Sequence, residues 1–336
     1  MKKIITILML SLLIIAMPIL SACGDSKIDN STPSSSEGYT ATDISVACMT
    51  GPTGVGMAKL MADSDAQKTA NNYSFTVASA ATEINPKFIK GEINIASVPT
   101  NVAAALYNQT GGKVRMLAVN TYGVLSILEK GDSIKSVADL KGKTIYSTGK
   151  GQNPEYILKY ILEKNGINIE TDVTIEFVSS EDLVAKLISG EAEVALAPEP
   201  AATTVMIKNT ALKRVLSIND EWAKVSDTKL MMGCVIALDS YVAENKAAVE
   251  KFLEEYNASI EFAKTNVDEA AKHCATYKIT ASEAIAKKAI PTCNLCYVTG
   301  AEMKTNVNGY FGVLFGADPK SIGGALPADD LFYNAK

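Results

Sequence analysis

Residues 44–66 read ISVACMTGPTGVGMAKLMADSDA, and they set the class of fold. Residues 44–49 are an apolar run with β-branched side chains, which predicts a strand, and residues 54–66 have the pattern of a helix. Glycine and proline separate the two segments. A strand that leads through a short loop into a helix is the repeating unit of α/β folds with largely parallel strands.

The same alternation continues along the chain and ends in a helical tail. Strands are predicted at residues 44–49, 74–78, 93–97, 114–120, 125–128, 144–147, 173–178, 194–197, 214–217 and 231–237. Helices are predicted between them, at residues 54–66, 82–90, 101–108, 137–140, 154–165, 180–189 and 201–208. The tail is predicted to contain four more helices, at residues 240–264, 267–277, 280–290 and 299–315.

Composition limits the kinds of partner. The 336 residues carry a formal net charge of -5, so no basic surface for nucleic acid is expected. Roughly 300 residues follow the N-terminal segment, which is enough for two ordinary domains. No cofactor motif is found, because Gly51, Gly54 and Gly56 do not form a nucleotide-binding fingerprint.

The N-terminus has the pattern of an export signal. Two lysines precede an apolar run in residues 1–22, and small residues precede Cys23. This order predicts a lipoprotein signal peptide and lipidation of Cys23, which would attach the protein to the cell membrane from outside the cytoplasm. A retained spanning helix is the weaker alternative. Residues 23–41 are polar and rich in serine and proline, so they predict a flexible tether.

Three stretches in the expected order resemble a known family. Residues 90–96 read KGEINIA, residues 136–145 read SVADLKGKTI, and residues 187–195 read LISGEAEVA, followed by PEP at 198–200. Together they resemble the SsuA-like and thiamine-pyrimidine-precursor-binding group of periplasmic binding proteins. The resemblance covers nearly all of the chain after residue 42.

The resemblance implies a two-lobe type II periplasmic-binding-protein fold, with a ligand cleft between the lobes. Lobe one would contain residues 42–123 and 234–336, and lobe two would contain residues 124–233. The protein would be a monomeric receptor that closes on a small-molecule solute and delivers it to an ABC permease in the membrane. The rival hypothesis is an enzyme similar to the pyrimidine-precursor synthase, which has this fold and uses pyridoxal phosphate.

Ligands of open α/β sheets bind beyond the carboxyl ends of the strands, so the strand-to-helix loops are the candidate sites. Each loop also has a purely structural explanation, such as a tight turn or a helix cap. In lobe one the candidates are Thr50, Gly51, Pro52, Thr53, Gly54, Ser79, Ala80, Ser97, Pro99 and Thr100. In lobe two and at the crossing they are Tyr122, Thr148, Gly149, Gly151, Gln152, Asn153 and Glu199.

Glu199 lies between two prolines, so we expect the turn to be rigid and its carboxylate to face either the cleft or water. No arginine lies in these loops, which mildly disfavours an oxyanion as the solute. Tyr146 and Trp222 could stack on a planar ring, although an aromatic residue near a strand end more often packs in the core. The candidate solutes are a thiamine-type pyrimidine, a sulfonate, a nitrate-like anion and a small aromatic molecule.

The cysteines allow several interpretations. His273 and Cys274 together with Cys293 and Cys296 provide the donors of a zinc site, but adjacent residues of a helix point in different directions. A local disulfide or reduced core cysteines are therefore preferred, and no metal is expected. His273 is the only histidine, which leaves a catalytic triad one possible base.

Overall fold

The first of two sheets contains six strands. The computed structural model describes residues 39–334, and these strands are β1 (Asp43–Met49), β2 (Asn72–Ala78), β3 (Ile95–Pro99), β4 (Val114–Thr121), β10 (Gly233–Leu238) and β11 (Leu295–Val298). Their order across the sheet is β11-β4-β10-β3-β1-β2. β1 pairs in parallel with β2 and β3, whereas β10 runs antiparallel to both of its neighbours.

The second sheet contains five strands. They are β5 (Leu125–Lys130), β6 (Thr144–Ser147), β7 (Thr174–Phe177), β8 (Val194–Pro198) and β9 (Leu212–Ser217), in the order β7-β6-β8-β5-β9. β6 pairs in parallel with β7 and β8, and β5 is antiparallel to β8 and β9. Each sheet therefore contains one antiparallel strand between other strands, β10 in the first sheet and β5 in the second, and the edge strand β11 of the first sheet is also antiparallel to its neighbour β4.

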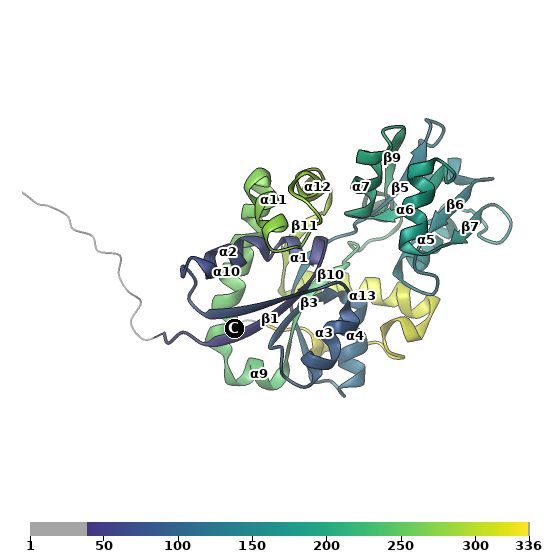
Figure 1. Ribbon diagram of the computed structural model, residues 1–336. Coiled ribbons are helices and arrows are strands. Elements are labelled where there is room, and N and C mark those ends of the chain that lie inside the picture. The colour runs from purple at the N-terminus through teal and green to yellow at the C-terminus, as the bar shows by residue number, and fades with distance from the viewer. Residues whose placement is uncertain (1–38, 335–336) are drawn as a thin grey trace, which may run out of the picture. The chain divides into compact units, whose positions relative to one another are not determined.

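Each sheet and the helices that cover it form one lobe, here named the first lobe and the second lobe in chain order. The helices are α1 (Pro52–Val55), α2 (Ala58–Asp65), α3 (Ala81–Ile89), α4 (Thr100–Gln109), α5 (Asn153–Lys164), α6 (Ser180–Ser189), α7 (Ala201–Lys208), α8 (Ile218–Val225), α9 (Asp239–Glu244), α10 (Lys246–Thr265), α11 (Val267–Thr276), α12 (Glu283–Ala289) and α13 (Gly300–Ala317). Short 3₁₀ helices lie at η1 (Val137–Leu140), η2 (Ile290–Thr292), η3 (Pro319–Ile322) and η4 (Asp329–Leu331). Figure 1 shows α3, α4 and α10 beside the first sheet, and α5, α6 and α7 beside the second.

The chain passes between the sheets twice. It leaves the first sheet after β4 and enters β5 of the second sheet after residues 122–124. It returns after β9, through residues 218–232, into β10. This mixed α/β fold with two sheets is the predicted class, and the residue boundaries predicted for the two lobes stay a prediction.

The sequence explains which strands are central. β3 reads IASVP and β8 reads VALAP, and the first four residues of each strand are buried, as expected for strands covered on both faces. β2 lies at an edge, and its residues alternate between exposed and partly buried along most of its length. The apolar runs therefore occupy the middle of each sheet.

Two predicted helices are each divided in the structure. Residues 54–66 form α1 and α2, which are separated at Gly56 and Met57, where glycine lowers the preference for a helix. Residues 240–264 form α9 and α10, which are separated at Asn245. The side chain of Asn245 donates to the carbonyl oxygen of Tyr241 over 3.1 Å, a local bond that competes with continuation of the helix.

One strand and one α-helix were not predicted. β11 lies in the tail, where only helices were expected, and it completes the first sheet at the edge beside β4. α8 begins after Ser217, whose hydroxyl accepts a hydrogen bond from the amide of Asp220 over 3.3 Å. A serine followed three residues later by an acidic residue is a capping signal that could have identified this helix.

Several predictions on the N-terminus cannot be compared with the structure. The signal peptide at residues 1–22, the lipidation site Cys23 and all but the last three residues of the tether lie outside the described residues. Within residues 39–334, none of the helices combines the length and the apolar character that crossing a bilayer requires.

Candidate functional site

The turn after β1 contains the first group of predicted binding residues. Gly51 has a φ of +84°, a conformation that favours glycine, and α1 starts directly after it at Pro52. The amides of Thr50 and Gly51 donate to the carbonyl oxygens of Ala78 and Ile279, each over 2.9 Å. These two amides are therefore already bound within the first lobe.

Residues packed beneath the turn, Met49 and Ser97, fix the positions of Gly54 and Thr53. A Cβ atom on Gly54 would lie 2.3 Å from the carbonyl oxygen of Met49, so the turn itself requires glycine at this position. The carbonyl oxygen of Thr53 accepts a hydrogen bond from the hydroxyl of Ser97 over 2.7 Å. Ser97 is fully buried, and it also accepts from the side chain of Asn120 over 2.7 Å. The Ser97 hydroxyl thus supports the turn and is not exposed at its surface.

The next two predicted loops precede α3 and α4. The amides of Ser79 and Ala80 both donate to the carboxylate of Glu83 over 3.0 Å, so Glu83 caps α3. Pro99 occupies the cap position of α4, and the hydroxyl of Thr100 donates to the carbonyl oxygen of Met231 over 2.6 Å. Neither Ser79 nor Thr100 caps its helix through its own side chain.

The loop between β6 and α5 has two glycines with positive φ, Gly149 at +77° and Gly151 at +70°. Gln152 occupies the cap position, and its amide donates to the carbonyl oxygen of Gly149 over 2.9 Å. The carboxylate of Glu155 reaches back to the amide of Gly151 over 2.6 Å. Thr148 is half-buried at the start of the loop. The loop is therefore held by its own helix.

Glu155 is a residue that the sequence analysis missed, although a glutamate three residues after a cap position is a recognised signal. Burial raises the pKa of Glu155, but the Lys159 ammonium at 2.7 Å and the Gly151 amide lower it more, so the pKa lies below the ordinary range. The carboxylate is charged, which strengthens its hold on the loop.

The turns of the two lobes meet at two places. The side-chain amide of Asn153, at the start of α5, donates to the side-chain oxygen of Asn101, at the start of α4, over 2.9 Å. A Cβ atom on Gly51 would lie 3.3 Å from the Cδ atom of Pro200, directly after β8. The structure thus brings together Asn153 with the Thr100 loop, and Gly51 with the Glu199 turn.

Glu199 has a different environment from the one expected. Its side chain is only 1% exposed, and its carboxylate forms an ion pair with Arg214 of β9. The same carboxylate accepts hydrogen bonds from the hydroxyl of Thr292 over 2.9 Å and from the amide of Thr203 over 3.3 Å. Three protein donors therefore occupy Glu199.

Arg214 was not among the candidates, because it lies within a strand and not in a loop. Its Nε atom donates to the hydroxyl of Ser126 over 3.0 Å, and its side chain is 23% exposed. Arginine occurs at only two positions in the chain, and the other, Arg115, pairs with Asp239 and Asp330 in the first lobe. Although the loops contain no arginine, Arg214 of the neighbouring strand lies beside one of them.

The aromatic candidates have structural partners. Trp222 is fully buried, 4.8 Å from the ring of Tyr160 and 5.9 Å from that of Tyr310, so it packs in the core. At the crossing, the ammonium of Lys229 lies 5.4 Å from the ring centre of Tyr122. Lys186 lies 5.8 Å from the ring centre of Tyr146.

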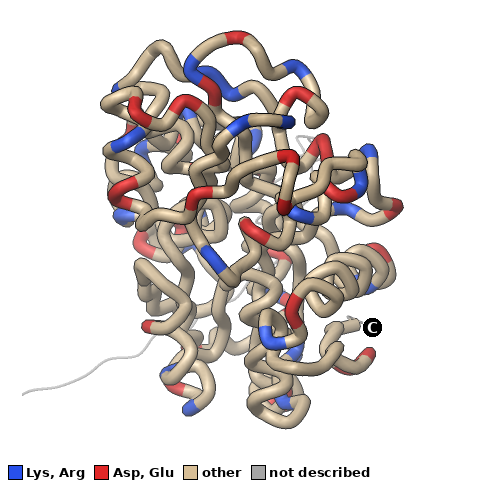
Figure 2. The backbone as a smooth tube through the Cα atoms, turned by 90° about the vertical axis from the view of Figure 1, so that its right-hand side faces the viewer, with Lys and Arg blue, Asp and Glu red and all other residues tan. Residues whose placement is uncertain are grey.

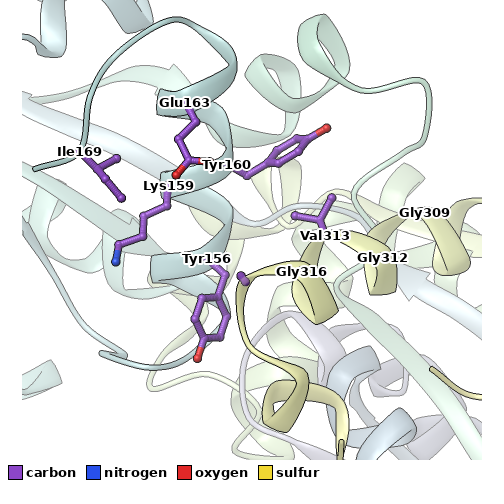
Figure 3. Close-up of a pocket in the computed structure, with 10 residues that line it drawn as sticks. Tyr156, Lys159, Tyr160, Glu163, Ile169, Gly309, Gly312, Val313 and Gly316 are labelled. Carbon is purple, nitrogen blue, oxygen red and sulfur yellow. The ribbon is translucent and has the colours of Figure 1, made fainter. Parts of the chain in front are cut away.

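A groove of about 660 Å³ lies where α5 meets α13. Figure 3 shows Tyr156 and Tyr160 of α5 on one side and Gly312 and Gly316 of α13 on the other. The hydroxyl of Tyr156 donates to Asp318, directly after α13, over 3.0 Å. This hydrogen bond is a further polar contact between α5 and the C-terminal segment.

The five cysteines between residues 39 and 334 are all free and buried. Burial raises the pKa of Cys48 and of Cys274 to about 12, and burial together with the Glu199 charge raises that of Cys293 well above its ordinary value. No group of three metal-binding side chains occurs in the described part of the chain. The sequence left a local disulfide and reduced core cysteines as the preferred alternatives, and the structure contains reduced core cysteines.

Charged side chains of both signs cover the molecule. Figure 2 shows lysines and arginines interspersed with aspartates and glutamates over the visible side. Many are paired along a helix, such as Lys251 with Glu254 over 2.8 Å and Lys264 with Glu261 over 2.8 Å. Such exposed pairs contribute little to stability.

The two sheets, the double crossing and the facing turns define the two-lobe fold of periplasmic binding proteins. An ABC transporter protein from Parabacteroides distasonis has this fold with a TM-score of 0.72 and 20% identity, covering 87% of this chain and 99% of its own. The aliphatic sulphonate-binding protein SsuA from Escherichia coli has a TM-score of 0.70 and 14% identity, covering 88% of this chain and 92% of its own.

Residues 120–270 match the family model described as "NMT1/THI5 like". A protein of Brucella abortus that is named as a binding protein is 24% identical over 165 residues, which is 49% of this chain and 50% of that protein. The match therefore spans about half the length of this relative.

Proposed function

We propose that this chain is the solute-binding receptor of an ABC importer, which captures a small molecule outside the cytoplasm and delivers it to a membrane permease. One observation carries the proposal: strand-tip turns from two separate sheets meet, Asn101 with Asn153 and Gly51 with Pro200. A solute held between such turns contacts both lobes, and only a ligand that binds the closed state more tightly can drive closure.

The solute belongs to one of four classes: thiamine-type pyrimidines, sulfonates, nitrate-like anions or small aromatic molecules. The Escherichia coli neighbour is named for binding aliphatic sulphonates, which supports the second class for this chain. The loops contain no arginine, but Arg214 of β9 lies beside the Glu199 turn. The sequence-based argument against an anionic solute therefore no longer applies. Arg214 and Glu199 neutralise each other, so the pair by itself favours neither a cationic nor an anionic solute.

A thermal-shift screen tests this function and identifies the class. The probes are 4-amino-5-hydroxymethyl-2-methylpyrimidine, butanesulfonate, nitrate and benzoate, each up to millimolar concentration. A ligand that binds only the folded protein stabilises it by about 2.7 kcal/mol at 100 times its Kd. One class should raise the melting temperature, and calorimetry should give one site per chain. If folded protein binds no member of the four classes, this assignment of solutes is wrong.

We further propose that Cys23 carries the lipid that holds the receptor at the membrane, and that the receptor is a monomer. The sequence order of residues 1–23 supports the anchor. Replacing Cys23 with serine should move the protein from the membrane fraction to the soluble fraction of cells. Light scattering of this variant should give the mass of one chain, and a dimer mass would contradict the monomer.

We propose no catalytic activity for the chain. The buried thiols support this view, because burial keeps them protonated and a thiol is a poor nucleophile. The rival hypothesis of a pyrimidine-precursor synthase predicts that pyridoxal phosphate binds. Our proposal predicts the opposite, so titration of the protein with pyridoxal phosphate should produce no protein-dependent absorbance change.

A further inference from the structure

We propose that Glu199 is a positioning residue for lobe closure: Arg214 holds its carboxylate, and the carboxylate binds Thr292 of the other lobe. This inference rests on the proposed function, because it assumes that the two lobes open and close. It assigns Glu199 to the contact between the lobes and not to the solute.

The carboxylate of Glu199 is held firmly in place. It lies directly after β8 of the second sheet, and its side chain is only 1% exposed. Arg214 pairs with it and is itself fixed by the hydroxyl of Ser126 over 3.0 Å. The amide of Thr203, in the first turn of α7, donates to the second oxygen over 3.3 Å. A buried carboxylate needs such partners, because an unpaired buried charge is strongly destabilising.

The partner in the other lobe is Thr292. It ends η2, and the chain enters β11 of the first sheet three residues later. Its hydroxyl lies 2.9 Å from the carboxylate of Glu199 and 3.0 Å from the carbonyl oxygen of Ala289. The hydroxyl has one proton, so it can donate to one of these acceptors at a time. The charged acceptor forms the stronger bond.

This choice of acceptors makes the contact reversible. When the lobes separate, the Thr292 hydroxyl can donate to Ala289, and Glu199 keeps Arg214 and the amide of Thr203. No buried polar group then loses its last partner, so opening carries no large penalty. The contact favours closure only by the difference between a charged and a neutral acceptor.

The surroundings fit a closure contact. Pro200, next to Glu199, is the residue that meets Gly51 of the first lobe. α7 begins directly after Pro200 and packs against α12, which precedes η2. Glu199 and Thr292 therefore lie beside a place where strand-tip turns of the two lobes already touch.

The size of the effect follows from hydrogen-bond strengths. A bond to a charged group contributes about 1 kcal/mol more than a neutral one, which is about fivefold in an equilibrium constant. Removing the Thr292 hydroxyl should therefore lower the ratio of closed to open molecules about fivefold. A contact of this strength adjusts closure without locking it.

The test needs no solute. Spin labels on cysteines introduced at two exposed positions, Lys87 of α3 and Ala185 of α6, report the distance between the lobes in the ligand-free protein. We expect Thr292→Val to reduce the ratio of short-distance to long-distance molecules about fivefold, and Thr292→Ser, which keeps the hydroxyl, to restore it. Thr265→Val is the matched control, because the Thr265 hydroxyl bonds only to nearby groups of the first lobe: it donates to Glu261 over 2.8 Å and to Phe262 over 3.5 Å, and it accepts from the side chain of Asn266 over 2.9 Å.

A double-mutant cycle tests the partner. Glu199→Gln keeps the shape of the side chain and removes its charge, so Thr292→Val should have a smaller effect in that background. Unchanged distances in Thr292→Val, or equal effects of Thr292→Val in both backgrounds, would overturn the proposal. Because these measurements contain no solute, they can fail while the screen for solutes succeeds, and the reverse is also possible.

Discussion

The side chains of Asn153 and Asn101 are joined by a hydrogen bond of 2.9 Å between residues 52 positions apart in the sequence. Each asparagine stands in the first turn of a helix, α5 in the second lobe and α4 in the first. The N-terminus of neither helix is capped by a side chain. The first backbone amides of both helices therefore lie near this pair without a side-chain acceptor. In the function proposed above, this pair lies where the solute contacts both lobes.

Replacing Asn153 with alanine should weaken solute binding by about fivefold to tenfold, since one hydrogen bond between the lobes contributes about 0.5 to 1.5 kcal/mol. Calorimetry with the solute that the screen identifies measures this loss. Asn165→Ala is the control, because Asn165 lies at the other end of α5 and its side chain bonds only to Ile161 over 2.8 Å. If Asn165→Ala weakens binding as much as Asn153→Ala, the asparagine pair has no special role.

Gly51→Ala should reduce solute affinity, whereas Gly91→Ala should not. Both glycines have positive φ, +84° and +76°, so each substitution should cost about 1 kcal/mol of stability. Only at Gly51 does the added Cβ meet the other lobe, 3.3 Å from Pro200, and at Gly91 it meets open space. Chemical denaturation and calorimetry separate the two effects, and equal affinities would show that the Gly51 turn does not contribute to the site.

Gly149 gives a second test in the loop of the other lobe. A Cβ atom there would lie 3.3 Å from the ring of Pro154, and the φ of +77° adds strain. This strain is confined to the loop before α5, so we expect Gly149→Val to distort the loop and to weaken solute binding more than it weakens folding, measured by the same two methods. Gly54 is unsuitable for this test, because its Cβ would lie 2.3 Å from the backbone of Met49 and the variant would lose stability first.

Glu129 makes the second lobe sensitive to acid. Burial raises the pKa of Glu129, but hydrogen bonds from the hydroxyl and amide of Ser133 and the amide of Ile134 lower it more, so the pKa lies below the ordinary range. A carboxyl group with a lowered pKa stabilises the fold above its unfolded pKa, and this contribution disappears as the pH falls through the folded pKa.

Glu129→Gln should therefore reduce the free energy of unfolding by about 1 to 3 kcal/mol at pH 7, and the difference from wild type should shrink below about pH 4. Urea unfolding at a series of pH values measures it. The exposed carboxylate of Glu193 provides the control, and Glu193→Gln should change stability by less than about 0.5 kcal/mol. A difference that stays constant down to pH 2 would contradict the explanation.

The buried Ser97 hydroxyl connects the Thr53 carbonyl oxygen to Asn120, and Asn120 also donates to the hydroxyl of Tyr256 over 2.9 Å. Ser97→Ala leaves the Thr53 oxygen without this donor and should cost about 1 to 3 kcal/mol in urea unfolding. Ser189→Ala, at an exposed serine at the end of α6, should cost less than about 0.5 kcal/mol. Equal costs would show that the network does not hold the turn.

The thiols of the described residues should be unreactive until the protein unfolds, because all five are buried. Iodoacetamide at pH 8 should label none of Cys48, Cys234, Cys274, Cys293 and Cys296 in the folded protein and all five in denaturant. Peptide mass spectrometry counts the labels. A disulfide between any two of them would contradict the reduced state.

Local patterns in the sequence were sufficient for most of the fold. α6 has the predicted bounds of 180–189, and β6 has the predicted bounds of 144–147, because apolar periodicity and caps act over a few residues. β11 was missed because its pairing partner β4 lies far away in the sequence, and because it lies among the helices of the tail, outside the strand–helix alternation that indicated short strands such as β6.

The candidate site shows the same division. Strand-tip loops such as 50–54 and 148–153 could be located from the sequence, since a glycine loop between a strand and a helix is a local signal. Arg214 could not, because its role depends on the side chain of Glu199, which directly follows a different strand, β8.

From its amino acids alone, this chain is fixed as an alternating α/β protein with its polar, glycine-rich loops at the strand ends. The folded molecule adds the choice of partners: Asn101 for Asn153, and Arg214 and Thr292 for Glu199. Glu199 and Thr292 are 93 positions apart, and no local preference acts over that distance. Only the packing of the two sheets, which depends on all their apolar residues together, brings such groups within a hydrogen bond of each other.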